Sequence, residues 1–455
     1  MEFLSGHKRE TALAILLLFV FICMSVFVVK QPFGDGPDEI NRYKVVSYIE
    51  KHGAIPLGDD PEIIIDGYGA SYAFQPILTY MIEGYLLHII SFLNLDFDTK
   101  LIIARYVNVF IGLIAAFYTV RLSRVLFGDD KTALLFSLAV IFLPQNIFIY
   151  TYVNTDGMGL LSVIMMVYAT ILGYKSDFNK ESLYTLVIGI ILCLMSYYNC
   201  YGYILMAFIA FIIYFVMKKD TDAMFKKGIP VALSVFLMAG WWFFRNILLY
   251  GSDIFALNAR RECAQLTGNI LWLENMANTY QAQGYTLKEM VFDTDYFTLV
   301  WKSFIAMFGP MSIPTHHYVY MAFKYLFFIC VVSLFIPKKV SVLPEIEKKS
   351  RIILWISMMT AMVIPAVLAL YYSYTWDFQP QGRYYLPCMI PFFFVLCLGM
   401  EKLITLICDL SKKILKTEKT PAFAQVLLYL ILYVFFFSSL IISIYEMIKF
   451  YASTL

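Results

Sequence analysis

Long apolar segments with few or no charged residues, separated by short polar segments, run through the whole chain. The first covers residues 12–29, and each of the later ones is close to the roughly 20 residues that a helix needs to cross a bilayer. The later segments are 100–120, 132–152, 157–174, 182–200, 201–217, 229–249, 319–336, 352–374, 384–401 and 421–447. The pattern predicts an all-α, polytopic transmembrane helical bundle with about 11 spans.

Lysine and arginine residues gather between the apolar segments and indicate how the bundle is oriented. Positively charged loops face the cytoplasm in membrane proteins, so each cluster is placed there. The clusters are Lys8/Arg9, Arg121/Arg124/Lys131, Lys175/Lys180, Lys218/Lys219/Lys226/Lys227, Lys338/Lys339/Lys348/Lys349/Arg351 and Lys402/Lys412/Lys413/Lys416/Lys419. The chain must then cross the membrane twice between successive clusters, and the final segment leaves the C-terminus outside.

Residues 76–93 are apolar, yet counting them as a span would place Arg121 and Arg124 outside and invert every later cluster. Glu83, His88 and the tyrosines between residues 80 and 85 favour instead a helix at the outer membrane surface. We therefore predict a first extracytoplasmic loop over residues 31–99 with interfacial helices. A second long extracytoplasmic loop covers 250–318, and its aromatic residues predict that it folds into helices on the same face.

Composition excludes several other classes of protein. The chain has 455 residues, 60% hydrophobic and 15% charged, which indicates one membrane-embedded domain over residues 1–455. A net charge of +2 without a single basic face excludes nucleic acid as a partner. The eight cysteines show no metal-ligand spacing, so no metal site is predicted from them. The absence of an Asn-x-Ser/Thr sequon favours a bacterial source.

Polar residues that are unusual in a membrane protein fall on the predicted outer side. Asp38 and Glu39 follow the first apolar segment, Asn154-Thr155-Asp156 separates two others, and Arg245 ends a further one. The turn Trp376-Asp377-Phe378-Gln379-Pro380-Gln381-Gly382-Arg383 precedes the segment 384–401. Since charge at membrane depth is tolerated when it is paired or wet, these segments predict a polar site at the outer helix ends.

These residues carry a family resemblance over about residues 10–400. The motifs are Asp38-Glu39, Gln75-Pro76-Ile77-Leu78-Thr79-Tyr80, Asn154-Thr155-Asp156, Trp241-Trp242-Phe243-Phe244-Arg245-Asn246 with Tyr250-Gly251-Ser252-Asp253, and Gln381-Gly382-Arg383-Tyr384. In this order they resemble the GT-C superfamily of membrane glycosyltransferases, in particular relatives of protein O-mannosyltransferases and aminoarabinose transferases. The chain departs from the family pattern at Gln75-Pro76-Ile77, where a Pro-Pro pair is more usual, and at Tyr198-Asn199-Cys200-Tyr201, where many relatives carry a lysine.

The resemblance implies an enzyme of the cell membrane that takes a sugar from a polyprenyl-phosphate donor, such as undecaprenyl phosphate, at the extracytoplasmic face. It also implies that the first outer loop carries the catalytic carboxylate. We expect Asp38 to act as the base for an acceptor hydroxyl and Glu39 to orient the acceptor, with Arg42 and Tyr43 close by. The alternative for the two carboxylates is a helix start after Pro37, which favours acidic residues, with Gly53 as the helix stop.

The remaining candidates are substrate-binding residues, each with a structural alternative. Asp156 would bind sugar hydroxyls or hold an arginine, although Asn154 and Asp156 are equally typical of a turn. Arg245, next to Asn246, and Arg383 would bind the donor phosphate, or else extend to the membrane surface. Trp376, Gln381 and Tyr384 flank that arginine, and the aromatic rings, with that of Tyr43, would shape a sugar pocket.

The leading hypothesis is an inverting glycosyltransferase that acts on an extracytoplasmic glycan, lipid or protein acceptor within the cell envelope. The alternative is a transporter or flippase of lipid-linked saccharides, which would place polar residues at mid-membrane depth. A scaffold for cell-wall assembly would not need Asp38. No cofactor is required by the sequence, although a divalent cation bridging Asp38, Glu39 and phosphate is compatible with it.

Overall fold

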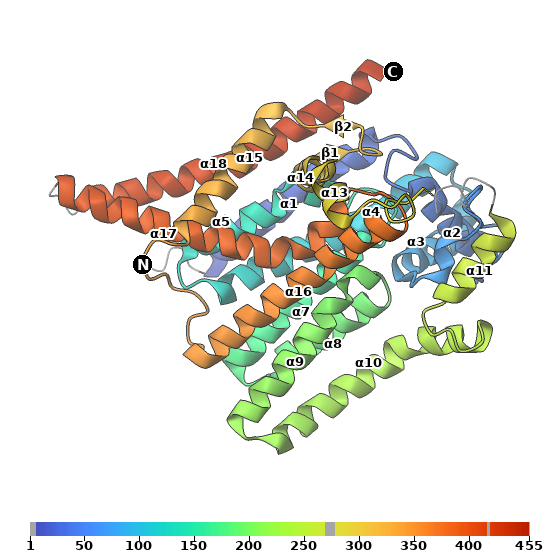
Figure 1. Cartoon of the computed structure of the whole chain (residues 1–455), viewed down its shortest axis with the longest axis horizontal. Coiled ribbons are helices and arrows are strands. Elements are labelled where there is room, and N and C mark those ends of the chain that lie inside the picture. Colours follow the sequence, from blue (N-terminus) through green and yellow to red (C-terminus); the bar gives the residue numbers. More distant parts are fainter. Residues whose placement is uncertain (1–5, 269–277, 416–418, 455) are drawn as a thin grey trace.

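The computed structural model describes residues 6–268, 278–415 and 419–454, and most of these are helical (Figure 1). The α-helices are α1 (Gly6–Lys30), α2 (Glu39–His52), α3 (Leu78–Ile89), α4 (Phe97–Leu126), α5 (Asp130–Ile141), α6 (Pro144–Phe148), α7 (Asp156–Ser176), α8 (Lys180–Leu194), α9 (Tyr201–Lys218), α10 (Thr221–Leu249), α11 (Leu257–Thr267), α13 (Leu287–Phe292), α14 (Tyr296–Ile305), α15 (His317–Ser333), α16 (Lys348–Thr375), α17 (Met389–Leu415) and α18 (Lys419–Thr454). Short 3-10 helices are η1 (Tyr72–Phe74), η2 (Ser91–Leu93), η3 (Tyr198–Cys200) and η4 (Gly382–Cys388). Strands β1 (Met307–Phe308) and β2 (Ile313–Pro314) pair antiparallel.

Eight helices among the described residues are long and apolar enough to cross a membrane, which makes the chain a multi-pass membrane protein. They are α1, α4, α7, α9 with η3, α10, α16, α17 with η4, and α18. The three other expected spans are helical but shorter. α8 has 15 residues and α15 has 17, while Pro144 starts the separate helix α6 soon after α5 ends at Ile141. The count of eleven therefore stays a prediction.

Helix α7 forms the centre of the bundle. Its membrane-length window is 94% buried, and it packs against α4, α8 and α9. By contrast α10 is only 17% buried and lies at the edge of the bundle beside α8 and α9 (Figure 1). A fully buried start of α7 makes its first residue, Asp156, part of the protein interior.

The first loop folds into α2 and α3, which pack against each other and against α4. At about 1.5 Å per residue the 12-residue α3 is shorter than the hydrocarbon core, as expected for a helix that does not span. The prediction that Tyr80 and Glu83 face the membrane surface was wrong. Both are fully buried, and Asn108 Nδ2 donates a hydrogen bond to Glu83 Oε1 at 2.7 Å, because a buried carboxyl needs a polar partner.

The second long loop is helical, as its aromatic content predicted. It contains α11, α13, α14 and the β1–β2 pair, while residues 269–277 lie outside the described residues. α11 is attached to the first loop, because Thr267 Oγ1 donates to the carbonyl oxygen of Gly69 at 2.6 Å. The α11 part of the second loop therefore packs on the first loop, and both lie on the right in Figure 1, whereas α13, α14 and the strands lie nearer its centre.

Candidate functional site

A cavity of about 420 Å³ lies between the first loop, η3, α11, the end of α16 and η4. Its lining includes Asp38, Arg42, Tyr68, Tyr72, Tyr197, Tyr198, Arg260, Leu368, Ala369, Tyr372, Trp376, Asp377, Gln379, Arg383 and Tyr384. A larger cavity of about 650 Å³ is lined by Asp59, Asp253 and Glu262 and by none of the predicted site residues. The smaller cavity is the candidate site, because its charged side chains contact one another.

The backbone at Asp38 directs its carboxylate into this cavity. Asp38 precedes α2 with a left-handed conformation (φ 62°, ψ 9°), and its side chain accepts no capping hydrogen bond from the helix. The helix starts at Glu39, shortly after Pro37, and Gly53 (φ 63°) ends it, as the helix alternative predicted. A left-handed backbone is uncommon for residues other than glycine, and such strain concentrates at functional sites.

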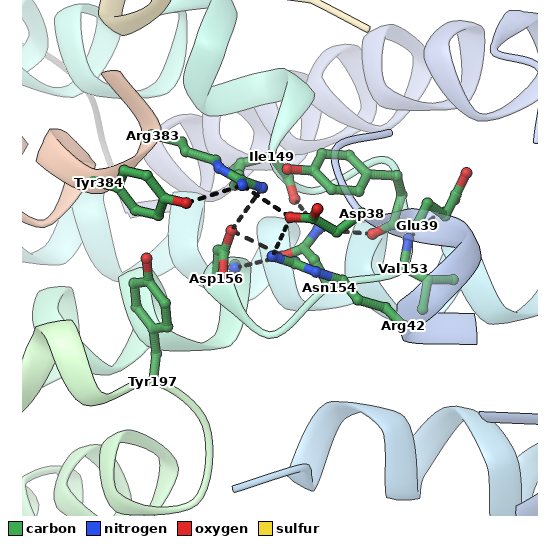
Figure 2. A network of polar contacts seen from close by, with 12 residues as sticks. Asp38, Glu39, Arg42, Ile149, Val153, Asn154, Asp156, Tyr197, Arg383 and Tyr384 are labelled. Atoms are coloured by element: carbon green, nitrogen blue, oxygen red, sulfur yellow. Dashed lines mark hydrogen bonds and ion pairs between the residues drawn. The ribbon is translucent and has the colours of Figure 1, made fainter. Parts of the chain in front are cut away.

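Four charged side chains from three parts of the fold form a ring of alternating sign, here called the charge ring: Asp38, Arg42, Asp156 and Arg383 (Figure 2). Arg383 Nη2 lies 2.9 Å from Asp38 Oδ2, and Arg383 Nη1 lies 4.0 Å from Asp156 Oδ2. Arg42 Nη2 and Nη1 lie 3.6 Å from Asp38 Oδ2 and 3.5 Å from Asp156 Oδ2. Asp38 is 37% exposed, whereas the other three side chains are 6–7% exposed, so Asp38 is the member open to the cavity.

The buried members of the charge ring keep polar atoms without hydrogen-bond partners in the protein. These atoms are Nε and Nη1 of Arg42, Nε and Nη1 of Arg383, and both carboxylate oxygens of Asp156. Buried polar groups are normally paired, and each unmade hydrogen bond costs about 1–3 kcal/mol. Within the charge ring these atoms are held by ion pairs at 3.5–4.0 Å, and Asp38, Arg42 and Arg383 are the members that line the cavity.

The charge ring also determines the ionisation of Asp38. Burial on its own would raise the pKa of this carboxyl, but the positive charges of Arg383 and Arg42 outweigh burial and lower the pKa below its ordinary value. Asp38 is therefore a carboxylate at neutral pH and can accept a proton.

Glu39 lies outside the cavity, although it neighbours Asp38 in the chain. Its carboxylate is fully buried and accepts two hydrogen bonds from Arg105, from Nε at 2.8 Å and from Nη2 at 2.6 Å. The backbone N–H groups of Gly34 and Val153 donate to it as well, at 3.1 and 3.2 Å. These contacts do not support the expectation that Glu39 orients an acceptor. They also separate Glu39 from Asp38, so the two carboxylates do not form the bridging cation site considered above.

Sequence reasoning missed Arg105, although the signal was present. It is a lone arginine inside the apolar segment 100–120, and a charge inside such a helix requires a partner. Arg105 Nη1 also donates to the carbonyl oxygens of Val28 and Gln31, at 3.0 and 2.7 Å. The Glu39–Arg105 pair thus connects the end of α1, the start of α2 and helix α4 in the protein interior next to the site.

Asn154 closes the turn that starts α7. Its Nδ2 donates to the carbonyl oxygens of Ile149 and Tyr152, both at 2.8 Å, and its Oδ1 accepts from the N–H of Gly157 at 3.0 Å. Asn154 is fully buried and does not line the cavity. Asn154 thus has the turn role that was one of its two predicted roles. The turn places Asp156 in the charge ring (Figure 2).

Arg245 and Asn246 lie away from the cavity on α10. Arg245 Nη2 donates to the carbonyl oxygen of Pro56 at 2.7 Å, and the guanidinium lies 5.0 Å from the centre of the Trp242 ring. Asn246 Nδ2 donates to the carbonyl oxygen of Ile254 at 3.2 Å. The structure therefore gives Arg245 no place beside the charge ring.

The other predicted residues divide between the cavity and its surroundings. Trp376 and Tyr384 line the cavity, and Arg383 Nη2 donates to Tyr384 Oη at 3.1 Å. Gln381 does not line it, and Tyr43 packs its ring against Phe33 and Phe97 elsewhere.

Several lining residues were not predicted as site residues. They include Tyr68, Tyr72, Tyr197, Tyr198, Arg260 and Tyr372. Tyr198 stands where the chain departs from the family motif, which was the available signal. Among the described residues, no group of three or more His, Cys, Asp or Glu side chains could hold a metal ion.

Comparison with known proteins gives the family of the chain. A family described as "Predicted membrane protein (DUF2142)" matches residues 65–391, which is well over half of the chain. The chain therefore belongs to this family. No curated protein matches it in sequence.

Comparison with solved structures gives the fold through one match. The chain resembles the oligosaccharyltransferase AglB from Archaeoglobus fulgidus, solved with an inhibitory peptide and a dolichol-phosphate, with a TM-score of 0.50 and 14% identity over 97% of this chain. The match covers 56% of AglB, so the chain spans about half the length of that protein. ArnT from Cupriavidus metallidurans is similar at 13% identity, over 89% of this chain and 80% of ArnT in the apo state (TM-score 0.37) and over 91% and 81% with undecaprenyl phosphate bound (TM-score 0.36). The expected GT-C-like fold is confirmed.

Proposed function

We propose that this member of the DUF2142 family is a membrane glycosyltransferase that moves a sugar from a polyprenyl-phosphate-linked donor to an extracytoplasmic glycan, lipid or protein. The observation that carries the proposal is the charge ring at the cavity, with an ionised, partly exposed Asp38 held between two arginines that line the same cavity. The GT-C-like fold supports the same class of reaction.

In the proposed reaction the oxygen of an acceptor hydroxyl attacks the anomeric carbon of the donor sugar. Asp38 accepts the hydroxyl proton while the new C–O bond forms, and a carboxylate within hydrogen-bond reach is suited to this role. The bond between the anomeric carbon and the phosphate oxygen breaks, and polyprenyl phosphate leaves with the electron pair. A single displacement of this kind inverts the anomeric configuration.

The neighbouring charges act as positioning residues. Arg383 and Arg42 hold the Asp38 carboxylate in its orientation, and Asp156 balances the charge of both arginines. The hydrogen bonds between Glu39 and Arg105 hold the start of α2 against α4. The low pKa of Asp38 keeps the base ionised at the expense of some basicity.

The distribution of basic residues supports placing this cavity on the extracytoplasmic face of the cell membrane. The two loops that wall it, 31–99 and 250–318, lie between basic clusters and carry the residues around Asp38 and Arg260. We propose that residues 1–455 act as one membrane-embedded domain.

The test is a transfer assay with purified protein in nanodiscs. Lipid-linked sugars extracted from the native membrane are supplied together with envelope acceptors, and free polyprenyl phosphate and glycosylated product are measured by mass spectrometry. An enzyme forms both in equal amounts. A transporter or flippase would move the lipid-linked saccharide across proteoliposomes without releasing polyprenyl phosphate, and that result would overturn the proposal.

A further inference from the structure

The cavity is lined by two chemically different sets of charged side chains, the charge ring and Arg260. In the charge ring, two arginines face two carboxylates, so the formal charges sum to zero. Arg260 lines the same cavity, and no carboxylate of the described residues lies within 4 Å of its guanidinium nitrogens. The positive charge of Arg260 is therefore not balanced locally.

The partners of Arg260 are aromatic. Its Nη2 donates to Tyr68 Oη at 2.9 Å, and the guanidinium lies 5.5 Å from the centre of the Tyr68 ring. Its Nε is buried without a hydrogen-bond partner. Asp377 also lines the cavity, but that carboxylate is exposed and accepts from Gln379 Nε2. A half-buried cation with an unused donor favours an anion as ligand.

Arg260 is carried by a helix with a fixed position. Asp253 Oδ2 accepts from the backbone N–H groups of Asn258 and Ala259, at 2.7 and 3.0 Å, and holds the start of α11. At the other end, a Cβ atom on Gly69 would lie only 2.2 Å from the backbone nitrogen of Gly268, so the first loop and the end of α11 pack backbone to backbone. A side chain on an anchored element is placed precisely enough for recognition.

We propose that Arg260 binds the phosphate of the lipid-linked donor, while the charge ring receives the uncharged hydroxyl groups of its sugar. This inference rests on the proposed function and gives the donor an orientation in the cavity. Guanidinium groups bind phosphate through paired N–H donors. Hydroxyl groups both donate and accept, and so match the three members of the charge ring that line the cavity, the carboxylate of Asp38 and the guanidinium groups of Arg42 and Arg383.

The same charges argue against the charge ring as the phosphate site. A phosphate on Arg383 would lie beside Asp38 and Asp156, and like charges at such distances repel. At Arg260 the phosphate meets no such carboxylate. The apolar side of the cavity, Leu368 and Ala369 on the membrane helix α16, offers a surface for the start of the polyprenyl chain.

The test is the affinity of the purified protein in nanodiscs for polyprenyl phosphate, compared with polyprenol, which lacks the phosphate. Arg260→Ala is expected to weaken binding of polyprenyl phosphate by about tenfold or more and to leave polyprenol binding unchanged. Arg261→Ala is the matched control, because it removes the same charge from the next residue of α11, whose guanidinium lies over Trp376 and does not line the cavity. Arg260→Gln gives the same comparison with a polar side chain and is the variant to use if the alanine protein unfolds.

The outcomes separate this inference from the proposed function. If the natural protein binds polyprenyl phosphate and the Arg260 variants bind it equally well, Arg260 is not the phosphate site and the inference fails while the proposed function stands. If the natural protein does not bind polyprenyl phosphate at all, the proposed function fails and this inference with it. Equal losses in the Arg260 and Arg261 variants would show a general effect of charge and would also overturn the inference.

Discussion

Asp38 and Glu39 are consecutive residues whose carboxylates serve different regions of the molecule. Asp38 lies at the cavity, 37% exposed, with ion-pair distances of 2.9 and 3.6 Å to two arginines. Glu39 lies in the interior, fully buried, and accepts four hydrogen bonds. A buried carboxylate with all its partners stabilises one conformation, whereas a partly exposed one that lines a cavity is available to a ligand. Two neighbouring carboxylates therefore have different environments, one open to the cavity, for which we propose a catalytic role, and one in the interior that holds the fold.

The largest expected effect is on catalysis at Asp38. Asp38→Asn keeps the size of the side chain but removes the proton acceptor, so turnover should fall by roughly two to four orders of magnitude. The measurement is the rate of polyprenyl phosphate release at saturating donor, with the thermal unfolding midpoint of the same protein as the control for folding. Full activity of the Asn variant would remove Asp38 from the mechanism.

The same substitution one residue later should affect stability instead. Glu39→Gln leaves the buried guanidinium of Arg105 without its carboxylate, which costs roughly 3–5 kcal/mol when one partner of a buried pair is removed. Thermal unfolding in detergent should show a much lower midpoint for Glu39→Gln than for Asp38→Asn. A Glu39→Gln protein that keeps its stability and loses only turnover would contradict the division between the two regions.

The pH dependence of transfer sharpens the role assigned to Arg383. Because the pKa of Asp38 is lowered, the active carboxylate persists below the ordinary range, and activity is lost only as the pH falls through that lowered pKa. Removing the charge with Arg383→Gln should move the acidic limb of the pH–rate profile to higher pH. Arg261→Gln, a charge-matched change outside the cavity, should not move it. An unmoved limb in Arg383→Gln would show that this arginine does not act on Asp38.

The smallest perturbation tests whether both ends of the first loop face outward. Cysteines introduced as Asp59→Cys and Asp98→Cys occupy exposed positions on either side of α3. Both should react with a membrane-impermeant thiol reagent on intact cells, and Lys349→Cys in a basic cluster should be protected. Labelling of only one loop position would make α3 a crossing and would separate the two loops that wall the cavity.

Much of the fold could be predicted from the sequence because it follows from local properties. Apolar length located the helices, and Gly53 located the end of α2, since a left-handed C-terminal residue favours glycine. The convergence of Asp38, Asp156 and Arg383 followed from placing their loops on one side of the membrane.

The membership of the site could not be predicted in full, because it depends on side-chain orientations that the local sequence does not determine. The left-handed backbone at Asp38 determines whether the side chains of Asp38 and Glu39 face the same region. The partner of Glu39 is Arg105, which lies 66 positions away in the sequence. Arg245 lies in a stretch that resembles a family motif, but the packing of α10 places its guanidinium against Trp242 and the carbonyl oxygen of Pro56. Arg260 lies in none of the recognised motifs, so the sequence did not mark it as a site residue. The packing of α11 against the first loop brings it to the cavity.

The most direct test of the central claim, a single displacement with Asp38 as base, is the anomeric configuration of the transferred sugar. A donor of known configuration is used with the purified protein, and the configuration of the linkage in the product is read by nuclear magnetic resonance. One displacement predicts inversion, together with loss of product in Asp38→Asn. A product with retained configuration would contradict the account, because retention requires an enzyme-bound sugar intermediate and a different role for Asp38.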